Sequence, residues 1–128
     1  MSKKILFVDD EPDVLKTLEA FFTSEGFRVI TATDGAQGLS KARTEKPDLI
    51  VLDIMLPKID GYKVCRMLKF DEELKKIPVI ILSARVQEED KKLGKEVGAD
   101  CYLTKPIDLE VLVAKMNELL SRPKSDVD

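Results

Sequence analysis

The chain has 128 residues, of which 44% are hydrophobic, and this length and composition suit one domain with one hydrophobic core. Its 21 basic and 24 acidic residues are too balanced and too mixed to indicate a nucleic-acid-binding protein, and the absence of histidine excludes Ser-His-Asp catalysis and His-ligated metals. No apolar run approaches the ~20 residues of a membrane span and no signal-peptide pattern follows Met1, so we expect a cytoplasmic protein.

Short apolar runs alternate with stretches of helical periodicity along the chain. In chain order, the first half predicts a strand over residues 4–8, a helix from Pro12 to just before Gly26, a strand over residues 28–32 and a helix capped by Asp34-Gly35. The second half predicts a strand over residues 49–52, a helix through Val64 and Leu68, a strand over residues 77–82, a helix over residues 86–97, a strand over residues 101–104 and a helix capped by Asp108. This alternation predicts an α/β fold, with a doubly wound, mostly parallel sheet of five strands.

Two of these elements have distinctive patterns. Residues 49–52 are all apolar and lie between Pro47-Asp48 and a loop rich in proline, aspartate and glycine, which is typical of a strand buried on both faces in the middle of a parallel sheet. Residues 86–97 contain few large apolar side chains and have Gly94 inside them. We therefore expect this helix to be less firmly anchored than the others.

Polar side chains stand at the carboxyl ends of four predicted strands. In chain order they are Asp9 and Asp10, Asp53, Ser83, and Lys105. These ends meet at one edge of an open parallel sheet, where the functional crevice lies. Carboxylates gathered there repel each other by about 4 kcal/mol per pair at ~4 Å and an effective dielectric near 20. A divalent ion with oxygen ligands, such as Mg²⁺, would neutralise them, and Asp53 is the candidate to carry a covalent phosphoryl group.

The same strand ends carry a resemblance to a known family. The motifs, in chain order, are Asp9-Asp10, Asp53 within LDIMLP (residues 52–57), Asp60-Gly61, Ser83-Ala84 and Lys105-Pro106. Each is weak alone, but together and in this order they resemble the receiver domain of two-component response regulators. The match runs from Lys4 to about Leu120, so we expect a receiver domain over residues 1–121 and a polar tail or the start of a linker over residues 122–128. The resemblance implies a flavodoxin-like (βα)5 fold with strand order 2-1-3-4-5.

The resemblance also implies a metal-dependent phosphoryl transfer. Asp53 would accept the phosphoryl group from the histidine of a sensor histidine kinase or a histidine phosphotransfer protein. Asp10, Asp53 and the backbone carbonyl of Met55 would hold Mg²⁺ directly, with Mn²⁺ as a possible substitute. Asp9 would belong to the metal site through a metal-bound water.

Further roles follow from the resemblance at the ends of the last two strands. Ser83 and Lys105 would bind the phosphoryl oxygens, and the Lys105-Pro106 peptide bond would be cis. Tyr102 would be a switch residue that rotates inward as the Ser83 hydroxyl moves toward the phosphate. The surface that binds an unknown downstream protein would consist of the helix over residues 86–97, the fifth strand and the last helix.

Two positions lie where the family varies. Met55 and Arg85 come two residues after Asp53 and Ser83, where side chains modulate dephosphorylation, and we expect Arg85 to change the lifetime of the phosphoryl group. The domain would catalyse only its own phosphorylation and dephosphorylation, and it would bind neither nucleic acid nor a membrane. The resemblance leaves open a dimer that depends on phosphorylation.

Other interpretations of these residues stay open at this point. Asp9 and Asp10 alone are also typical of solubilising acids or of a helix cap. A small phosphohydrolase with an aspartyl-phosphate intermediate would use the same carboxylates, although the chain has no insertion for substrate recognition. A pseudo-receiver would keep the fold as an interaction module without phosphorylation. A flavin-binding protein of the same sheet order is disfavoured because an acidic crevice repels a phosphate without a metal.

Overall fold

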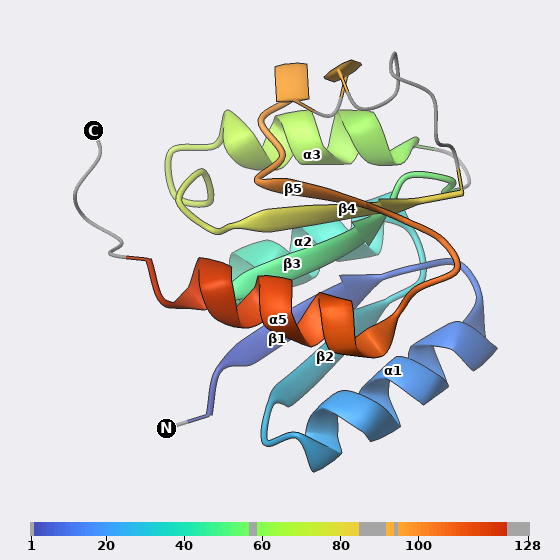
Figure 1. The fold of residues 1–128 in the computed structure, drawn as a ribbon. Helices are drawn as coiled ribbons and strands as arrows, with labels where there is room; N and C mark the ends of the chain where they lie inside the picture. The colour runs from blue at the N-terminus through green and yellow to red at the C-terminus, as the bar shows by residue number, and fades with distance from the viewer. Residues whose placement is uncertain (1, 57–58, 85–91, 94, 123–128) are drawn as a thin grey trace.

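The apolar runs of the sequence form one parallel sheet. The computed structural model of the chain describes residues 2–56, 59–84, 92–93 and 95–122. Its strands are β1 (Lys4–Val8), β2 (Arg28–Ala32), β3 (Leu49–Asp53), β4 (Val79–Ser83) and β5 (Cys101–Thr104). They lie in the order β2-β1-β3-β4-β5, and every neighbouring pair is parallel, which confirms the predicted sheet (Figure 1).

Two strand boundaries differ from the prediction. β4 begins at Val79 rather than at residue 77, because Pro78 has no N–H to donate to the ladder. β4 also extends one residue beyond the prediction, through Ser83, whereas β3 ends at Asp53, the residue predicted to close its apolar run. Both polar residues are therefore the last residues of their strands and share the fixed geometry of the sheet.

Helices cover both faces of the sheet (Figure 1). They are α1 (Pro12–Ser24), α2 (Gly35–Glu45), α3 (Gly61–Lys69) and α5 (Leu109–Leu120). The side chains of Asp34, Asp60 and Asp108 each accept a hydrogen bond from a backbone N–H of the helix that follows, at 2.8, 3.1 and 3.0 Å. The predicted caps at Asp34 and Asp108 are thus confirmed. The predicted helix over residues 86–97 falls largely outside the described residues.

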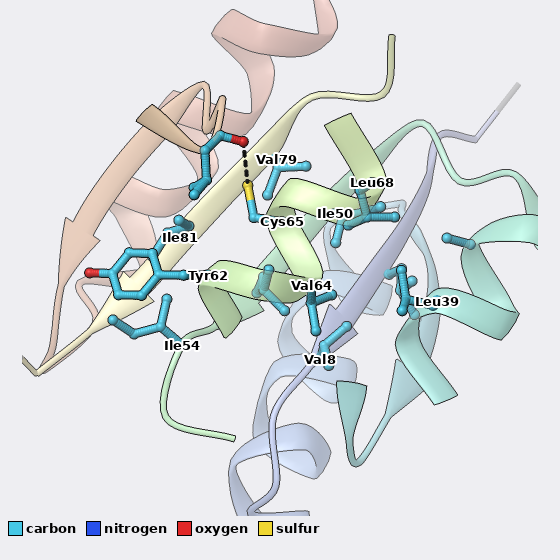
Figure 2. Packing of buried hydrophobic residues seen from close by; sticks show 14 of the residues in the cluster. Val8, Leu39, Ile50, Ile54, Tyr62, Val64, Cys65, Leu68, Val79 and Ile81 are labelled. Carbon is cyan, nitrogen blue, oxygen red and sulfur yellow. Dashed lines mark hydrogen bonds between the residues drawn. The ribbon is translucent and has the colours of Figure 1, made fainter. Parts of the chain in front are cut away.

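The core consists of two hydrophobic clusters, one on each face of the sheet. Successive strand residues point to opposite faces, so Ile50 and Ile81 join the cluster under α2 and α3, while Val51 lies in the cluster under α1 and α5. Figure 2 shows residues of α3, including Val64 and Cys65, packed against the strands of the first cluster. With both faces covered, the central strands are rigid supports for the residues at their carboxyl ends. Among the described residues, no helix is both long and apolar enough to cross a membrane.

Candidate functional site

An acidic cluster lies at the carboxyl ends of β1 and β3. The two strands are neighbours, with Val8 paired to Leu52, so the residues that follow these positions come together at one edge. Asp9, Asp10 and Asp53 each offer a carboxylate oxygen within 4.8 Å of the others. Asp9 and Asp53 are 2% and 3% exposed, whereas Asp10 is exposed to solvent. The structure therefore brings together the three carboxylates that the sequence placed at this edge.

Backbone and side-chain donors hold the two buried carboxylates. Asp9 Oδ1 accepts a hydrogen bond from the Glu11 N–H, and Asp53 Oδ1 accepts one from the Met55 N–H, both at 2.9 Å. The Lys105 ammonium reaches over from the end of β5 and donates to Asp53 Oδ2 at 2.9 Å and to Asp9 Oδ2 at 3.5 Å. The lysine is thus placed between the two buried acids, in contact with both.

The electrostatics of the site favour a cationic partner. Burial raises the pKa of Asp9 above its usual value, and the charge of Asp53 adds to this effect, while the Glu11 N–H and Lys105 oppose it. Burial by itself would lower the pKa of Lys105, but hydrogen bonds to Asp53 and the charges of Asp53 and Asp9 raise it overall, so the ammonium stays charged. Three carboxylates and one ammonium leave two formal negative charges, which one divalent cation would neutralise.

The donor set suits Mg²⁺. All three side chains offer hard oxygen ligands within 4.8 Å of each other, and the exposure of Asp10 leaves water access on one side. Mg²⁺ binds through one or two carboxylates and keeps several waters, so this half-open arrangement fits it better than a closed cage would.

Ser83 and the Lys105-Pro106 peptide bond lie at the same edge. Ser83 is fully buried, and its carbonyl accepts a 2.7 Å hydrogen bond from the Lys105 N–H. The Lys105-Pro106 peptide bond is cis, as the resemblance implied. Met55 lies two residues after Asp53 and is 54% exposed. Arg85, predicted to modulate the site, lies outside the part of the chain that the structure describes.

Tyr102 has a neighbour that the sequence analysis missed. It is half-buried on β5, and its hydroxyl oxygen lies 3.5 Å from that of Tyr62, the second residue of α3. Tyr62 is only 9% exposed. No local pattern signals this pairing, because the two residues are 40 positions apart and meet only through the packing of α3 on the sheet.

Comparisons with known proteins agree with this geometry. A family model described as "Response regulator receiver domain" matches residues 5–117. The chain is 48% identical over 122 residues to "Alkaline phosphatase synthesis transcriptional regulatory protein PhoP" of Bacillus subtilis, a match that covers 95% of this chain and 50% of PhoP. It is 42% identical over 118 residues to protein PilH of Pseudomonas aeruginosa, covering 92% of this chain and 98% of PilH.

Solved structures give the same result. The crystallised chemotaxis protein CheY4 of Vibrio cholerae superimposes with a TM-score of 0.88 at 28% sequence identity, covering 93% of this chain and 99% of CheY4. The lengths of the relatives differ, however. This chain spans about half the length of the transcriptional regulators that it matches, such as PhoP, and nearly all of PilH.

Proposed function

Because the chain belongs to the family of response regulator receiver domains, we propose that Asp53 accepts a phosphoryl group in a Mg²⁺-dependent reaction. The donor would be the phosphohistidine of a sensor histidine kinase or of a histidine phosphotransfer protein. A carboxylate oxygen of Asp53 would bond to phosphorus while the bond from phosphorus to the histidine nitrogen breaks, so that the imidazole leaves and an acyl phosphate remains.

The observation that carries this proposal is the way Asp53 is held. Its Oδ1 is fixed by the Met55 N–H and its Oδ2 contacts Lys105 Nζ, each at 2.9 Å, so the carboxylate is oriented before any donor arrives. The side chain is almost completely buried at the end of a central strand, which excludes much of the competing water. An oriented carboxylate beside a fixed cation suits an attack on a negatively charged phosphoryl group.

Other residues of the site would stabilise the charge that develops. Asp10, Asp53 and the Met55 carbonyl would hold Mg²⁺ directly, and Asp9 would act through a bound water. The metal, or Mn²⁺ in its place, would supply a positive charge close to the transferring oxygens. Lys105 is positioned to move its ammonium from Asp53 Oδ2 to a phosphoryl oxygen on the same residue.

Phosphorylation would then act on a binding surface at the far side of β4. In this proposal the Ser83 hydroxyl and the Tyr102 side chain rearrange together, and the surface formed by residues 86–97, β5 and α5 binds a downstream protein. Val111 on α5 is 44% exposed, which gives this surface an apolar contact point. A shift from 1:99 to 99:1 between two states needs about 5.5 kcal/mol, which a few charge-assisted hydrogen bonds supply.

The domain would turn over no external substrate, and it would modify only itself. We propose a cytoplasmic location, in keeping with membership of the response regulator receiver family.

The test is to incubate the protein with a small-molecule phosphodonor and measure its intact mass. We expect one added phosphoryl group with Mg²⁺ and none when the metal is chelated. Asp53→Asn should abolish the addition, whereas Asp13→Asn, the same change at an exposed residue on α1, should leave it intact. The proposal fails if the wild type gains no mass, or if Asp53→Asn gains as much as the wild type does. Steady turnover of a phosphomonoester would instead indicate a phosphohydrolase.

A further inference from the structure

The two tyrosines of the chain, Tyr62 and Tyr102, form a pair. Their hydroxyl oxygens are 3.5 Å apart, so one phenol donates a long hydrogen bond to the other. The Tyr62 ring lies in the hydrophobic cluster that also contains Ile54 and Ile81 (Figure 2). Tyr102 packs against the same cluster. The contact is therefore supported by packing on both sides.

The pair joins α3, which follows β3 in the chain, to β5, which is not a neighbour of β3 in the sheet. Ile81 of β4 is paired to Leu52 on β3 and to Tyr102 on β5, so β4 lies between those two strands. The tyrosine contact crosses β4 on the α3 face of the sheet. The ion pair between Lys105 and Asp53 connects the carboxyl ends of β5 and β3. The chain around β5 is thus linked to β3 by the ion pair at the site and to α3 by the tyrosine contact beside it.

The α3 end of this link is tied to the segment that follows Asp53. The Gly61 N–H donates to the Ile54 carbonyl at 3.0 Å. The approach is so close that a Cβ on Gly61 would lie 2.3 Å from the Ile54 Cα. Tyr62 is the next residue, so its position depends directly on the backbone next to Asp53.

The β5 end of the link is tied to the cation of the site. Tyr102 lies three residues before Lys105 on the same strand and its extension. Tyr102 also shares a sheet face with Ser83, since Ile81 is paired to Tyr102 and residues two apart on a strand point the same way. A phosphoryl group on Asp53 would change the partner of Lys105 Nζ, and the end of β5 would have to adjust.

Building on the proposed function, we infer that Tyr62 is a positioning residue whose hydroxyl couples Tyr102 to the phosphorylation state of Asp53. In the conformation described here, the phenol pair holds Tyr102 against the α3 face. Phosphorylation changes the geometry of both ends of the link, so the hydrogen bond between the phenols differs in strength between the two states. Tyr62 thereby biases the equilibrium of the switch without touching the phosphoryl group.

The composition of the chain makes this inference testable. Because the chain has 2 tyrosines, ¹³C labelling of tyrosine rings gives NMR signals from this pair alone. The variants Tyr62→Phe and Tyr102→Phe assign each signal to its residue. We expect Tyr62→Phe to shift the Tyr102 signal in the unphosphorylated protein, and phosphorylation to shift both signals in the wild type. We expect each single variant to change the rate of phosphorylation by the small donor about two- to fivefold, as suits one long hydrogen bond.

A double-mutant cycle distinguishes coupling from a purely structural role. If the hydroxyls act through each other, the Tyr62→Phe/Tyr102→Phe variant changes the rate no more than the larger single change does. Thr17→Val removes a hydroxyl that bonds the Asp13 carbonyl in α1, and it should leave the rate unchanged. A lower melting temperature with unaltered rates would indicate that the pair only stabilises the fold, which overturns the inference.

The outcomes also separate this inference from the proposed function. If the wild type gains no phosphoryl mass, the proposed function is wrong and this inference is wrong with it. If the mass increases but the tyrosine signals stay fixed, or if the rate changes of the single variants simply multiply, the inference alone is overturned.

Discussion

Asp9 carries a charge that its burial disfavours. The residue is 2% exposed, and burial raises its pKa even though Lys105 lies 3.5 Å away. Since the unfolded chain ionises this carboxyl more readily than the folded protein does, the ionised form lowers the free energy of unfolding at neutral pH. Asparagine keeps the acceptor for the Glu11 N–H and removes the charge. We expect Asp9→Asn to raise the free energy of unfolding by about 1 kcal/mol at pH 7 without divalent metal, as measured by urea denaturation.

The pH and metal dependence check the cause of that effect. Below the usual carboxyl pKa of 3.8, Asp9 is protonated in both the folded and the unfolded state. The higher free energy of unfolding of Asp9→Asn should therefore disappear there. Added Mg²⁺ should stabilise the wild type more than the variant, because the variant offers one carboxylate fewer. Asp10→Asn is the matched control, and its exposed position predicts a smaller change in the metal-free protein. A metal-free Asp9→Asn protein less stable than the wild type would contradict this account.

The start of α3 is an element boundary on which the site depends. Gly61 packs directly on the backbone of Ile54, the residue after Asp53, and an added Cβ would approach the Ile54 Cα to 2.3 Å and the Asp53 carbonyl oxygen to 2.7 Å. Backbone atoms cannot yield as a flexible side chain can, so the helix or the end of β3 must move. We expect Gly61→Ala to lower the free energy of unfolding by about 3 kcal/mol, measured by chemical denaturation.

Gly38 provides the comparison within the same fold. It lies inside α2, and the three atoms nearest to its added Cβ all belong to the side chain of Val8, the first at 3.1 Å. Alanine is also favoured over glycine in a helix interior by about 1 kcal/mol, which offsets the tighter packing. We expect Gly38→Ala to change the free energy of unfolding by less than about 1 kcal/mol. If both variants lost the same free energy of unfolding, the cause would be a general intolerance of larger residues and not the close approach at Gly61.

The elements also show what a sequence can and cannot predict. The apolar run of β3 and the caps at Asp34 and Asp108 are local patterns, so they were predicted from neighbouring residues alone. The gathering of Asp53 and Lys105 followed from the rule that parallel strands end at one edge. The contact between the tyrosines of α3 and β5 has no such rule, because it depends on how a helix settles on the sheet.

At the scale of the whole molecule, the two covered faces make the sheet a barrier between separate clusters. Cys65 lies in the cluster under α3 and Cys101 packs against the other cluster, so the two thiols are on opposite faces of the sheet. The Cys65 thiol donates to the Val97 carbonyl across 3.6 Å (Figure 2). A buried thiol in such a place exchanges its proton with water only when the surrounding structure opens.

This burial gives the stability of the whole domain a dependence on alkaline pH. Burial raises the pKa of Cys65 from 9.0 to about 12, so between these values the unfolded chain loses a proton that the folded protein keeps. This ionisation stabilises the unfolded state relative to the folded state, so the free energy of unfolding should fall by up to about 1.4 kcal/mol per pH unit above pH 9. Below pH 9 the thiol is protonated in both states, so Cys65 does not make the free energy of unfolding depend on pH.

The measurement compares urea denaturation of the wild type and Cys65→Ala from pH 7 to pH 10.5. Cys65→Ala should be less stable than the wild type at pH 7, because it loses the hydrogen bond to Val97 and some packing. It should not show the fall in the free energy of unfolding that Cys65 causes above pH 9. The two stability curves should therefore converge as the pH rises, since every other titrating group is common to both proteins. Cys101→Ala controls for a half-buried thiol, whose pKa burial also raises, and its curve should converge less steeply. Parallel curves for the wild type and Cys65→Ala would mean that Cys65 ionises in the folded protein about as readily as in the unfolded chain, through a local opening of α3 that leaves the rest of the sheet intact.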